Sequence, residues 1–145
     1  SGALLTSCID ALPTMIKPNT DEIGQLLGRE VTTEDQVIEA ARELHKRGIK
    51  IVVVSLGAKG ALMVSDEGTF RANPPKIEAI NPVGAGDTLV GSFAVALAQQ
   101  KPTSECLTFA LSCATASCLS AGTGRFDQDV ATKIQKQVTI KKIAE

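Results

Sequence analysis

Two kinds of apolar pattern alternate along this chain, and together they predict a succession of helices and strands. Segments in which apolar residues recur every three or four positions predict helices, over residues 3–11, 20–27, 33–47, 87–98, 103–121 and 127–137. Short apolar runs bounded by Gly, Pro or polar residues predict strands, over residues 14–17, 49–56, 61–64, 69–72, 77–80 and 138–143. Capping signals at Asn19 or Thr20 and at Thr33 mark two of the helix starts.

The strongest strand indicates the fold class. Ile51–Val54 contains no polar residue, which is typical of a central strand covered on both faces. The turn Asp66–Gly68 lies between two shorter strands and predicts a hairpin. The sequence therefore predicts an α/β fold, in which a mainly parallel sheet is flanked by helices and carries an antiparallel hairpin portion. We expect a single domain over residues 1–145.

The charge balance argues against two classes of partner. The chain has 15 Lys and Arg against 16 Asp and Glu, a formal net charge of -1, so it has no excess of positive charge to attract nucleic acid or an anionic membrane. No apolar run is long enough to span a membrane, and no secretory signal is recognisable. We expect a cytoplasmic protein, with an aliphatic core because Trp and Tyr are absent.

The cysteines and the single histidine do not form a metal-binding pattern. Cys8, Cys106, Cys113 and Cys118 include no Cys-x-x-Cys pair, which predicts free, buried thiols in a reducing compartment. His45 lies among Lys and Arg residues, on what we expect to be a solvated helix face. A zinc site is not predicted.

The first candidate site is a glycine-rich turn that leads directly into a helix. Gly84 and Gly86 flank Ala85, and glycines let a ligand approach the backbone while the first N–H groups of a helix remain unpaired. Such groups suit an anion that gains charge during phosphoryl transfer. Asp87 would lie in the first turn, where it could accept a proton from an attacking hydroxyl. The same residues also fit an ordinary turn, with Asp87 as an N-terminal helix charge.

The second candidate site follows the strongest strand. Ligands bind outside the carboxyl ends of the strands in open α/β sheets, and a small hydroxyl and two glycines occupy that place here. A tight turn between strands would explain the same residues. The segment comprises Ser55, Leu56, Gly57, Ala58, Lys59 and Gly60.

The third candidate site follows the first strand of the sheet. Asn19 and Glu22 are three residues apart at a predicted helix start, so both could face one site beside Lys17. Amide and carboxylate oxygens suit Mg²⁺. A plain helix cap by Asn19 and a first-turn charge at Glu22 is the alternative interpretation.

In order and spacing, these three motifs resemble those of the ribokinase-like, or phosphofructokinase B, carbohydrate kinases. The signature of that family, commonly Asp-Thr-x-Gly-Ala-Gly-Asp, is matched by residues 81–87, its Asn-x-x-Glu motif by Asn19 and Glu22, and its nucleotide loop by residues 55–60. The likeness covers nearly the whole chain but only the carboxyl-terminal half of the family.

The resemblance implies a kinase that binds ATP, Mg²⁺ and a small sugar phosphate. It implies that residues 84–86 form an anion hole, that Asp87 is the catalytic base, and that Asn19 and Glu22 organise Mg²⁺. The nucleotide would bind at residues 55–60 with Lys17 and Asn19 near its phosphates, and Thr115 would lie on the helix that flanks the adenine. A homodimer formed through a lid outside this chain is left open.

One departure from the family signature bears on the substrate. Asn81-Pro82 stands where Asp-Thr is usual, which resembles the branch that acts on phosphorylated hexoses, such as 1-phosphofructokinase and tagatose-6-phosphate kinase. The resemblance then implies transfer of phosphate to a ketohexose phosphate. It also weakens the expectation of a bound monovalent cation.

Three alternatives stay open on the sequence. The chain could bind nucleotide without catalysing transfer, or belong to a kinase of an unphosphorylated sugar or nucleoside. A Rossmann-type dehydrogenase would need a third glycine at the position of Leu89, and Pro82 disfavours a strand directly before the turn.

Overall fold

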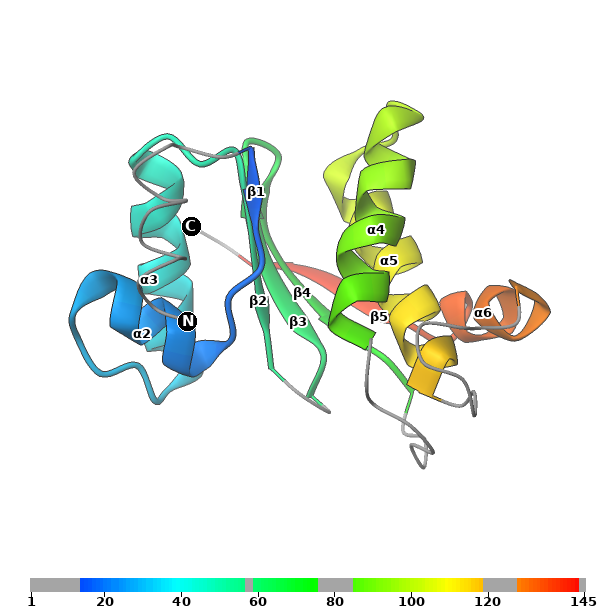
Figure 1. Ribbon diagram of the computed structural model, residues 1–145, viewed down its shortest axis with the longest axis horizontal. Coiled ribbons are helices and arrows are strands. Elements are labelled where there is room, and N and C mark those ends of the chain that lie inside the picture. The colour runs from blue at the N-terminus through cyan, green and yellow to red at the C-terminus, as the bar shows by residue number, and fades with distance from the viewer. Residues whose placement is uncertain (1–13, 57–58, 76–84, 119–127, 144–145) are drawn as a thin grey trace. The chain divides into compact units, whose positions relative to one another are not determined.

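The computed structural model describes residues 14–56, 59–75, 85–118 and 128–143 (Figure 1). These residues fall into two compact units. Unit 1 holds the described residues within 1–57, 61–71 and 142–145, and unit 2 holds those within 58–60 and 72–141. The predicted helix at 3–11 and the predicted strand at 77–80 lie outside the described residues.

Five strands form one sheet in the order β1-β2-β3-β4-β5. Their bounds are Met15–Ile16, Ile51–Ser55, Ala61–Ser65, Gly68–Asn73 and Thr139–Ile143. Strands β1 and β2 run parallel, whereas β2 and β3 run antiparallel. The α/β class is thus confirmed, but the sheet is mixed. Its antiparallel part is larger than predicted because the connection from β2 to β3 is too short for a parallel crossover.

Two helices of unit 1 connect the parallel strands. Helices α2 (Thr20–Leu27) and α3 (Glu34–Lys46) provide the crossover that leads from β1 to β2. Asn19 caps the start of α2, and Gly28 ends this helix in the left-handed conformation with a φ of 66°. Thr33 caps α3. These boundaries agree with those predicted from the capping residues and the glycine.

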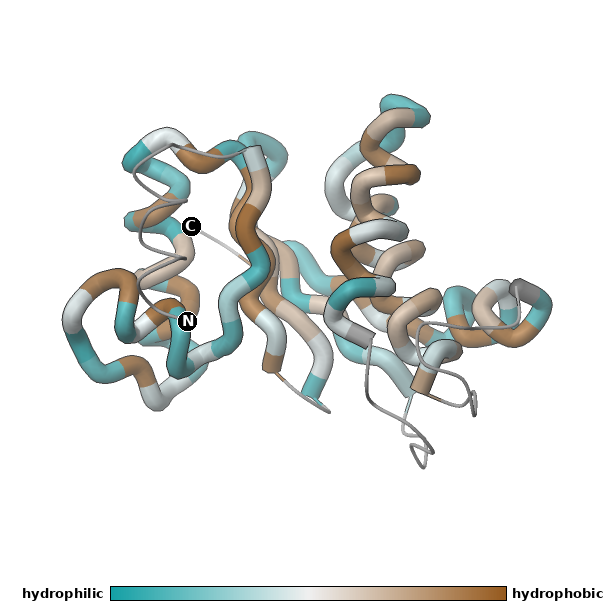
Figure 2. The backbone as a smooth tube through the Cα atoms, in the orientation of Figure 1, coloured by the Kyte–Doolittle hydropathy of each residue, from teal (hydrophilic) through white to brown (hydrophobic). Residues whose placement is uncertain are grey.

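The core of unit 1 is aliphatic, as the composition predicted. It lies between the two helices and the sheet, and Figure 2 shows the hydrophobic colouring of β1 and β2 beside the mixed colouring of α3. Most of its side chains are completely inaccessible to solvent. They include Ile23, Leu44, Ile49, Val52, Val54 and Leu62.

Unit 2 consists mainly of three helices, whose bounds are Ala85–Ala98 (α4), Thr103–Cys118 (α5) and Gln128–Gln135 (α6). Helix α5 packs against both α4 and α6. The buried side chains of Phe93 and Leu107 lie on the first two of these helices. Among the described residues, no helix combines the length and the hydrophobicity needed to cross a membrane.

The described cysteines are free, as predicted. Cys106 and Cys113 are buried and Cys118 is partly buried, whereas Cys8 lies outside the described residues. Burial raises the pKa of the Cys113 thiol, and a hydrogen bond with Ser92 offsets part of that effect. Burial also raises the pKa of Cys118. These thiols are therefore less often in the reactive thiolate form than exposed ones.

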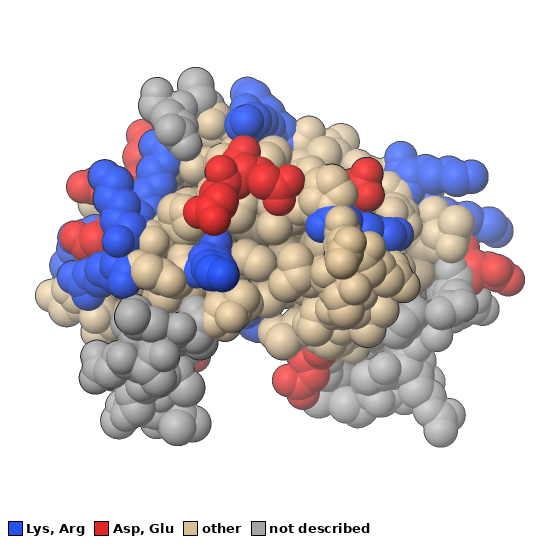
Figure 3. All heavy atoms as spheres, turned by 90° about the horizontal axis from the view of Figure 1, so that it is seen from above, with Lys and Arg blue, Asp and Glu red and all other residues tan. Residues whose placement is uncertain are grey.

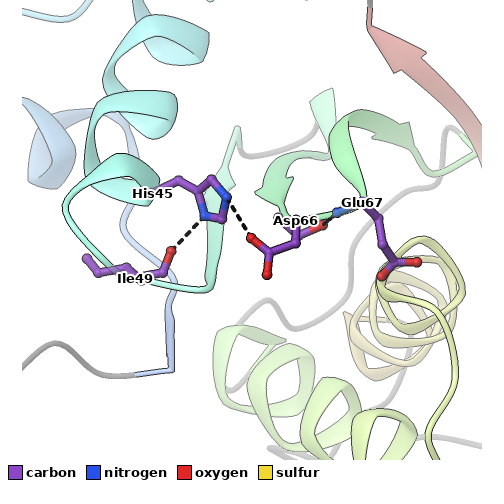
Figure 4. Close-up of polar contacts among 5 residues, drawn as sticks. His45, Ile49, Asp66 and Glu67 are labelled. Carbon is purple, nitrogen blue, oxygen red and sulfur yellow. Dashed lines mark hydrogen bonds and ion pairs between the residues drawn. The ribbon is translucent and has the colours of Figure 1, made fainter.

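His45 is not on a fully solvated helix face, so that expectation was wrong. Its Nδ1 lies 2.8 Å from the carbonyl oxygen of Ile49, and its Nε2 lies 3.1 Å from Oδ1 of Asp66 (Figure 4). The chain turns back directly after α3, which brings the start of β2 and the β3–β4 turn against the last turn of the helix. The His45 side chain is consequently only 23% exposed.

Charged side chains of both signs lie beside one another on the face of the molecule drawn in Figure 3. Two ion pairs of unit 1 join Arg71 to Glu34 and Arg29 to Glu43. Acidic side chains also lie among the basic ones that gather at the left of this view.

Candidate functional site

The carboxyl ends of β1 and β2 bring two of the predicted motifs together in unit 1. Asn19 pairs with Ser55 in an isolated parallel bridge beyond the strands. The Ser55 N–H donates a hydrogen bond of 3.0 Å to the carbonyl oxygen of Pro18. Because parallel strands end at the same edge of a sheet, the segment containing Lys17 and Asn19 lies beside the start of the 55–60 loop.

The side chains at this junction are accessible to different degrees. Asn19 is exposed, whereas Lys17, Ser55 and Leu56 are partly buried. Leu56 packs against the hydrophobic core of unit 1. The start of the loop is therefore anchored on its apolar side by Leu56.

Asn19 and Glu22 form a capping box at the start of α2. The Asn19 Oδ1 accepts the N–H of Glu22 at 2.8 Å, and the Glu22 Oε1 accepts the N–H of Asn19 at 3.0 Å. The local interpretation of these residues as a helix cap is thus confirmed. The box holds both side chains at the amino-terminal end of α2, where the helix dipole favours an anion.

The donor set fits Mg²⁺ with few protein ligands. The box uses only Oε1 of the Glu22 carboxylate, so its Oε2 is not part of the cap. Mg²⁺ commonly keeps several water molecules and binds one or two carboxylates together with phosphates. Among the described residues, no group of three or more His, Cys, Asp or Glu side chains could enclose a metal ion. A Mg²⁺ ion here would need ligands from a nucleotide and from water.

The end of the loop is fixed in unit 2. Gly60 is buried and has a φ of 99°, a conformation that side chains rarely adopt. A Cβ atom at this position would lie 2.1 Å from the carbonyl oxygen of Ala72. The preceding Lys59 is exposed. Gly57 and Ala58, which complete the predicted nucleotide loop, lie outside the described residues.

Helix α4 starts two residues earlier than the predicted start at Asp87, so Ala85 and Gly86 belong to the helix and not to a turn before it. Ala85 is the first residue of the helix, and Gly86 and Asp87 are exposed in its first turn. The N–H groups at the start of an α-helix have no partner within the helix. The carboxylate of Asp87 therefore lies at the surface of unit 2, next to these groups, and is not buried in the interior. Gly84 lies outside the described residues.

Thr115 occupies a buried position on α5. Its hydroxyl donates a hydrogen bond of 2.8 Å to the carbonyl oxygen of Leu111, one turn earlier in the same helix. The side chain is only 7% exposed. Its polar group is thus satisfied locally, and a role beside the adenine stays a prediction.

Sequence reasoning missed Asn73, the last residue of β4. Its Nδ2 donates a hydrogen bond of 3.0 Å to the carbonyl oxygen of Lys59 at the end of the predicted loop. The available signal was the order Asn73-Pro74-Pro75 at the end of a predicted strand. Asn side chains often form hydrogen bonds with backbone groups at turns.

A comparison with protein families excludes one of the open alternatives. Residues 3–129 match the model of the pfkB family carbohydrate kinases. This chain belongs to that family. The Rossmann-type dehydrogenase is thereby excluded as an explanation of the glycine-rich turn, since the pfkB match includes the turn itself.

Relatives and solved structures of this pfkB chain include phosphofructokinases and a ribokinase. The chain is 34% identical to 1-phosphofructokinase of Vibrio cholerae over 136 residues. This alignment covers 94% of the chain and 43% of the relative. The chain resembles phosphofructokinase-2 of Escherichia coli, crystallised with substrates and products, at a TM-score of 0.89 and 35% identity, covering 94% of this chain and 45% of the other.

The ribokinase of Arabidopsis thaliana, crystallised with ribose and ATP, gives a TM-score of 0.77 and 30% identity over 90% of this chain and 43% of its own. The ribokinase-like fold is thus confirmed. The pfkB chain spans less than half the length of these relatives.

Proposed function

We propose that this pfkB chain is the nucleotide-binding and catalytic half of an ATP-dependent kinase of a ketohexose phosphate, of the 1-phosphofructokinase or tagatose-6-phosphate kinase type. The observation that carries the proposal is the junction of β1 and β2, where Asn19 lies beside Ser55. This junction brings two motifs with the chemistry of phosphate and metal binding to one edge of the sheet. The likeness to 1-phosphofructokinase supports the choice of substrate class.

The nucleotide phosphates bind along the loop from Ser55 to Gly60, with Lys17 and Asn19 beside them. Backbone N–H groups and the ammonium of Lys17 compensate the negative charge of the phosphates. Asn19 and Glu22 would hold Mg²⁺, which would supply positive charge against the phosphate oxygens. The cap at the start of α2 fixes both side chains before the nucleotide arrives.

Asp87 acts as the base in an in-line transfer. Its carboxylate takes the proton of the attacking sugar hydroxyl while that oxygen forms a bond to the γ-phosphorus of ATP. The bond from the γ-phosphorus to the bridging oxygen breaks, and ADP leaves. The backbone N–H groups of Ala85, Gly86 and Asp87 bind the transferred phosphoryl group, because the first N–H groups of α4 have no partners within the helix.

The decisive experiment is a panel of ketose phosphates assayed with ATP on the full-length protein. We expect turnover with fructose 1-phosphate, fructose 6-phosphate or tagatose 6-phosphate, and a fall in kcat of about 100- to 10,000-fold in the variant Asp87→Asn, because the amide cannot accept the proton. The KM for ATP should change little.

The matched control is Glu105→Gln, which removes an exposed carboxylate from the first turn of another helix, α5. It should leave kcat unchanged. Normal turnover of Asp87→Asn would contradict the assignment of the base, and no turnover by the wild-type protein on any member of the panel would contradict the proposed substrate class.

A second candidate function applies to the 145-residue chain taken alone. The chain spans less than half of its relatives, which favours a nucleotide-binding fragment that is inactive by itself. Binding of ATP to the isolated chain without turnover, measured by calorimetry and a coupled assay, would support this interpretation. Turnover by the isolated chain would reject it.

A further inference from the structure

The end of strand β4 lies directly against the end of the 55–60 loop, within unit 2. Asn73 is the last residue of this strand, and its side-chain amide donates a hydrogen bond of 3.0 Å to the carbonyl oxygen of Lys59. The next residue of the loop, Gly60, approaches the backbone of Ala72 so closely that no Cβ atom would fit. Two neighbouring residues of β4 thus hold two neighbouring residues of the loop.

The side-chain amide of Asn73 donates its hydrogen bond at a point where the two following residues have no N–H group. Pro74 and Pro75 follow it in the sequence, and proline has no N–H group. Pro74 also lies against Gly60, with its Cδ 3.0 Å from the place where a Cβ atom would be. The hydrogen bond from the Asn73 side chain therefore helps to fix the carbonyl group of Lys59.

Fixing this carbonyl group fixes a whole peptide unit of the loop. The peptide between Lys59 and Gly60 is planar, and the described residues contain no cis peptide bond. The direction of the Lys59 carbonyl consequently determines the direction of the Gly60 N–H. Loops that bind phosphate do so largely through the directions of their peptide groups.

The geometry points to Asn73 as a positioning residue, which holds the Lys59–Gly60 end of the loop in the conformation that binds the phosphates of the nucleotide. This inference rests on the proposed function. Asn73 touches neither the nucleotide nor the sugar in this account, and it acts through Lys59 and Gly60. Its loss should therefore weaken the binding of ATP and leave the chemical step intact.

The test compares Asn73→Ala and the isosteric Asn73→Asp, both of which remove the donor, with wild-type full-length protein. One hydrogen bond contributes about 1 kcal/mol, so we expect the KM and the Kd for ATP to rise about fivefold. The kcat and the KM for the sugar phosphate should stay unchanged. Amide hydrogen exchange of residues 55–60 should accelerate in both variants without nucleotide, because the loop becomes free to sample other conformations.

The control variant is Gln99→Ala, which removes an exposed amide just after α4. It should change neither the exchange of the loop nor the KM for ATP. Wild-type exchange in the loop together with a wild-type Kd for ATP in both Asn73 variants would overturn the inference. Equal losses in kcat and in both KM values would also overturn it, since they would indicate general disruption.

The failure of the proposed function would be distinguishable from these results. A wild-type protein that lacks turnover and does not bind ATP would contradict the proposed function through the assay alone. Accelerated exchange of residues 55–60 in the Asn73 variants would still support the positioning of the loop by this residue.

Discussion

At the scale of single residues, the backbone at the end of the 55–60 loop leaves no room for a side chain at Gly60. Gly60 combines a φ of 99° with the close approach to Ala72. Gly91 on α4 differs in both respects, because a Cβ atom there would meet nothing within 4 Å and its φ lies outside the left-handed region. These two glycines therefore differ in their tolerance of a methyl group.

We expect Gly60→Ala to lower the free energy of unfolding by about 1–3 kcal/mol, because the new side chain forces the backbone out of its place or into strain. Gly91→Ala should instead raise it by about 0.5–1 kcal/mol, since alanine favours an exposed helix interior. Urea unfolding of both variants measures the two changes. Equal effects of the two substitutions would contradict the strain that we expect of an alanine at position 60.

Residue types alone could not reveal the strain at Gly60. The sequence allowed a tight turn at residues 55–60 as one of two interpretations, because glycine is the usual residue of such turns. It did not show that Ala72 and Asn73 would lie against that turn, since their approach depends on the pairing of β3 with β2 and on the hairpin that follows. Contacts between segments distant in sequence are settled by packing and not by local pattern.

At the scale of elements, the two helices of unit 1 start with the same kind of cap but differ in what the cap can do. Thr33 and Gln36 form the box of α3, and Asn19 and Glu22 form the box of α2. Gln36 thus fills in the capping box of α3 the position that Glu22 fills in the capping box of α2. Replacing Glu22 by glutamine should keep the cap and remove only the negative charge.

We expect Glu22→Gln to leave the free energy of unfolding nearly unchanged while raising the concentration of Mg²⁺ needed for half-maximal turnover several-fold, because a neutral amide binds Mg²⁺ more weakly than a carboxylate. Thr33→Ala serves as the opposite control. It should cost about 1 kcal/mol of stability and leave the Mg²⁺ requirement as it was. An unchanged Mg²⁺ requirement in Glu22→Gln would limit Glu22 to its role in the cap.

Most elements could be predicted because their signals are local. The starts of α2 and α3 follow from capping residues, the end of α2 from Gly28, and β2 from its uninterrupted apolar residues. The antiparallel pairing of β2 with β3 was not predicted, because a buried strand has the same apolar pattern in parallel and antiparallel sheets. The environment of His45 was missed because the β3–β4 turn, which covers it, is distant in sequence.

At the scale of the whole molecule, the proposed function predicts a coupling between nucleotide binding and stability. A ligand that binds only the folded protein raises its free energy of unfolding by about 2.7 kcal/mol when present at 100 times its Kd. We expect this gain for ATP with Mg²⁺ in thermal unfolding of the full-length protein. AMP at the same concentration should give a much smaller gain, because it lacks the phosphates that the 55–60 loop is proposed to bind.

If AMP and ATP raised the free energy of unfolding equally, the binding energy would come from the adenosine portion of the nucleotide. The wild-type protein and Asn73→Ala should then respond alike to either ligand. A smaller gain with ATP in Asn73→Ala than in wild type would instead agree with a loop that recognises phosphate.

The bridge between Asn19 and Ser55 also has a consequence for how the protein folds. The two residues are separated along the chain by the whole of α2 and α3, so their meeting closes a long loop. Contacts of such long sequence separation are entropically costly and tend to arise late in folding. A newly made chain should therefore remain unable to capture nucleotide until its β1–β2 pairing is complete, which makes nucleotide capture a reporter of the last stage of folding.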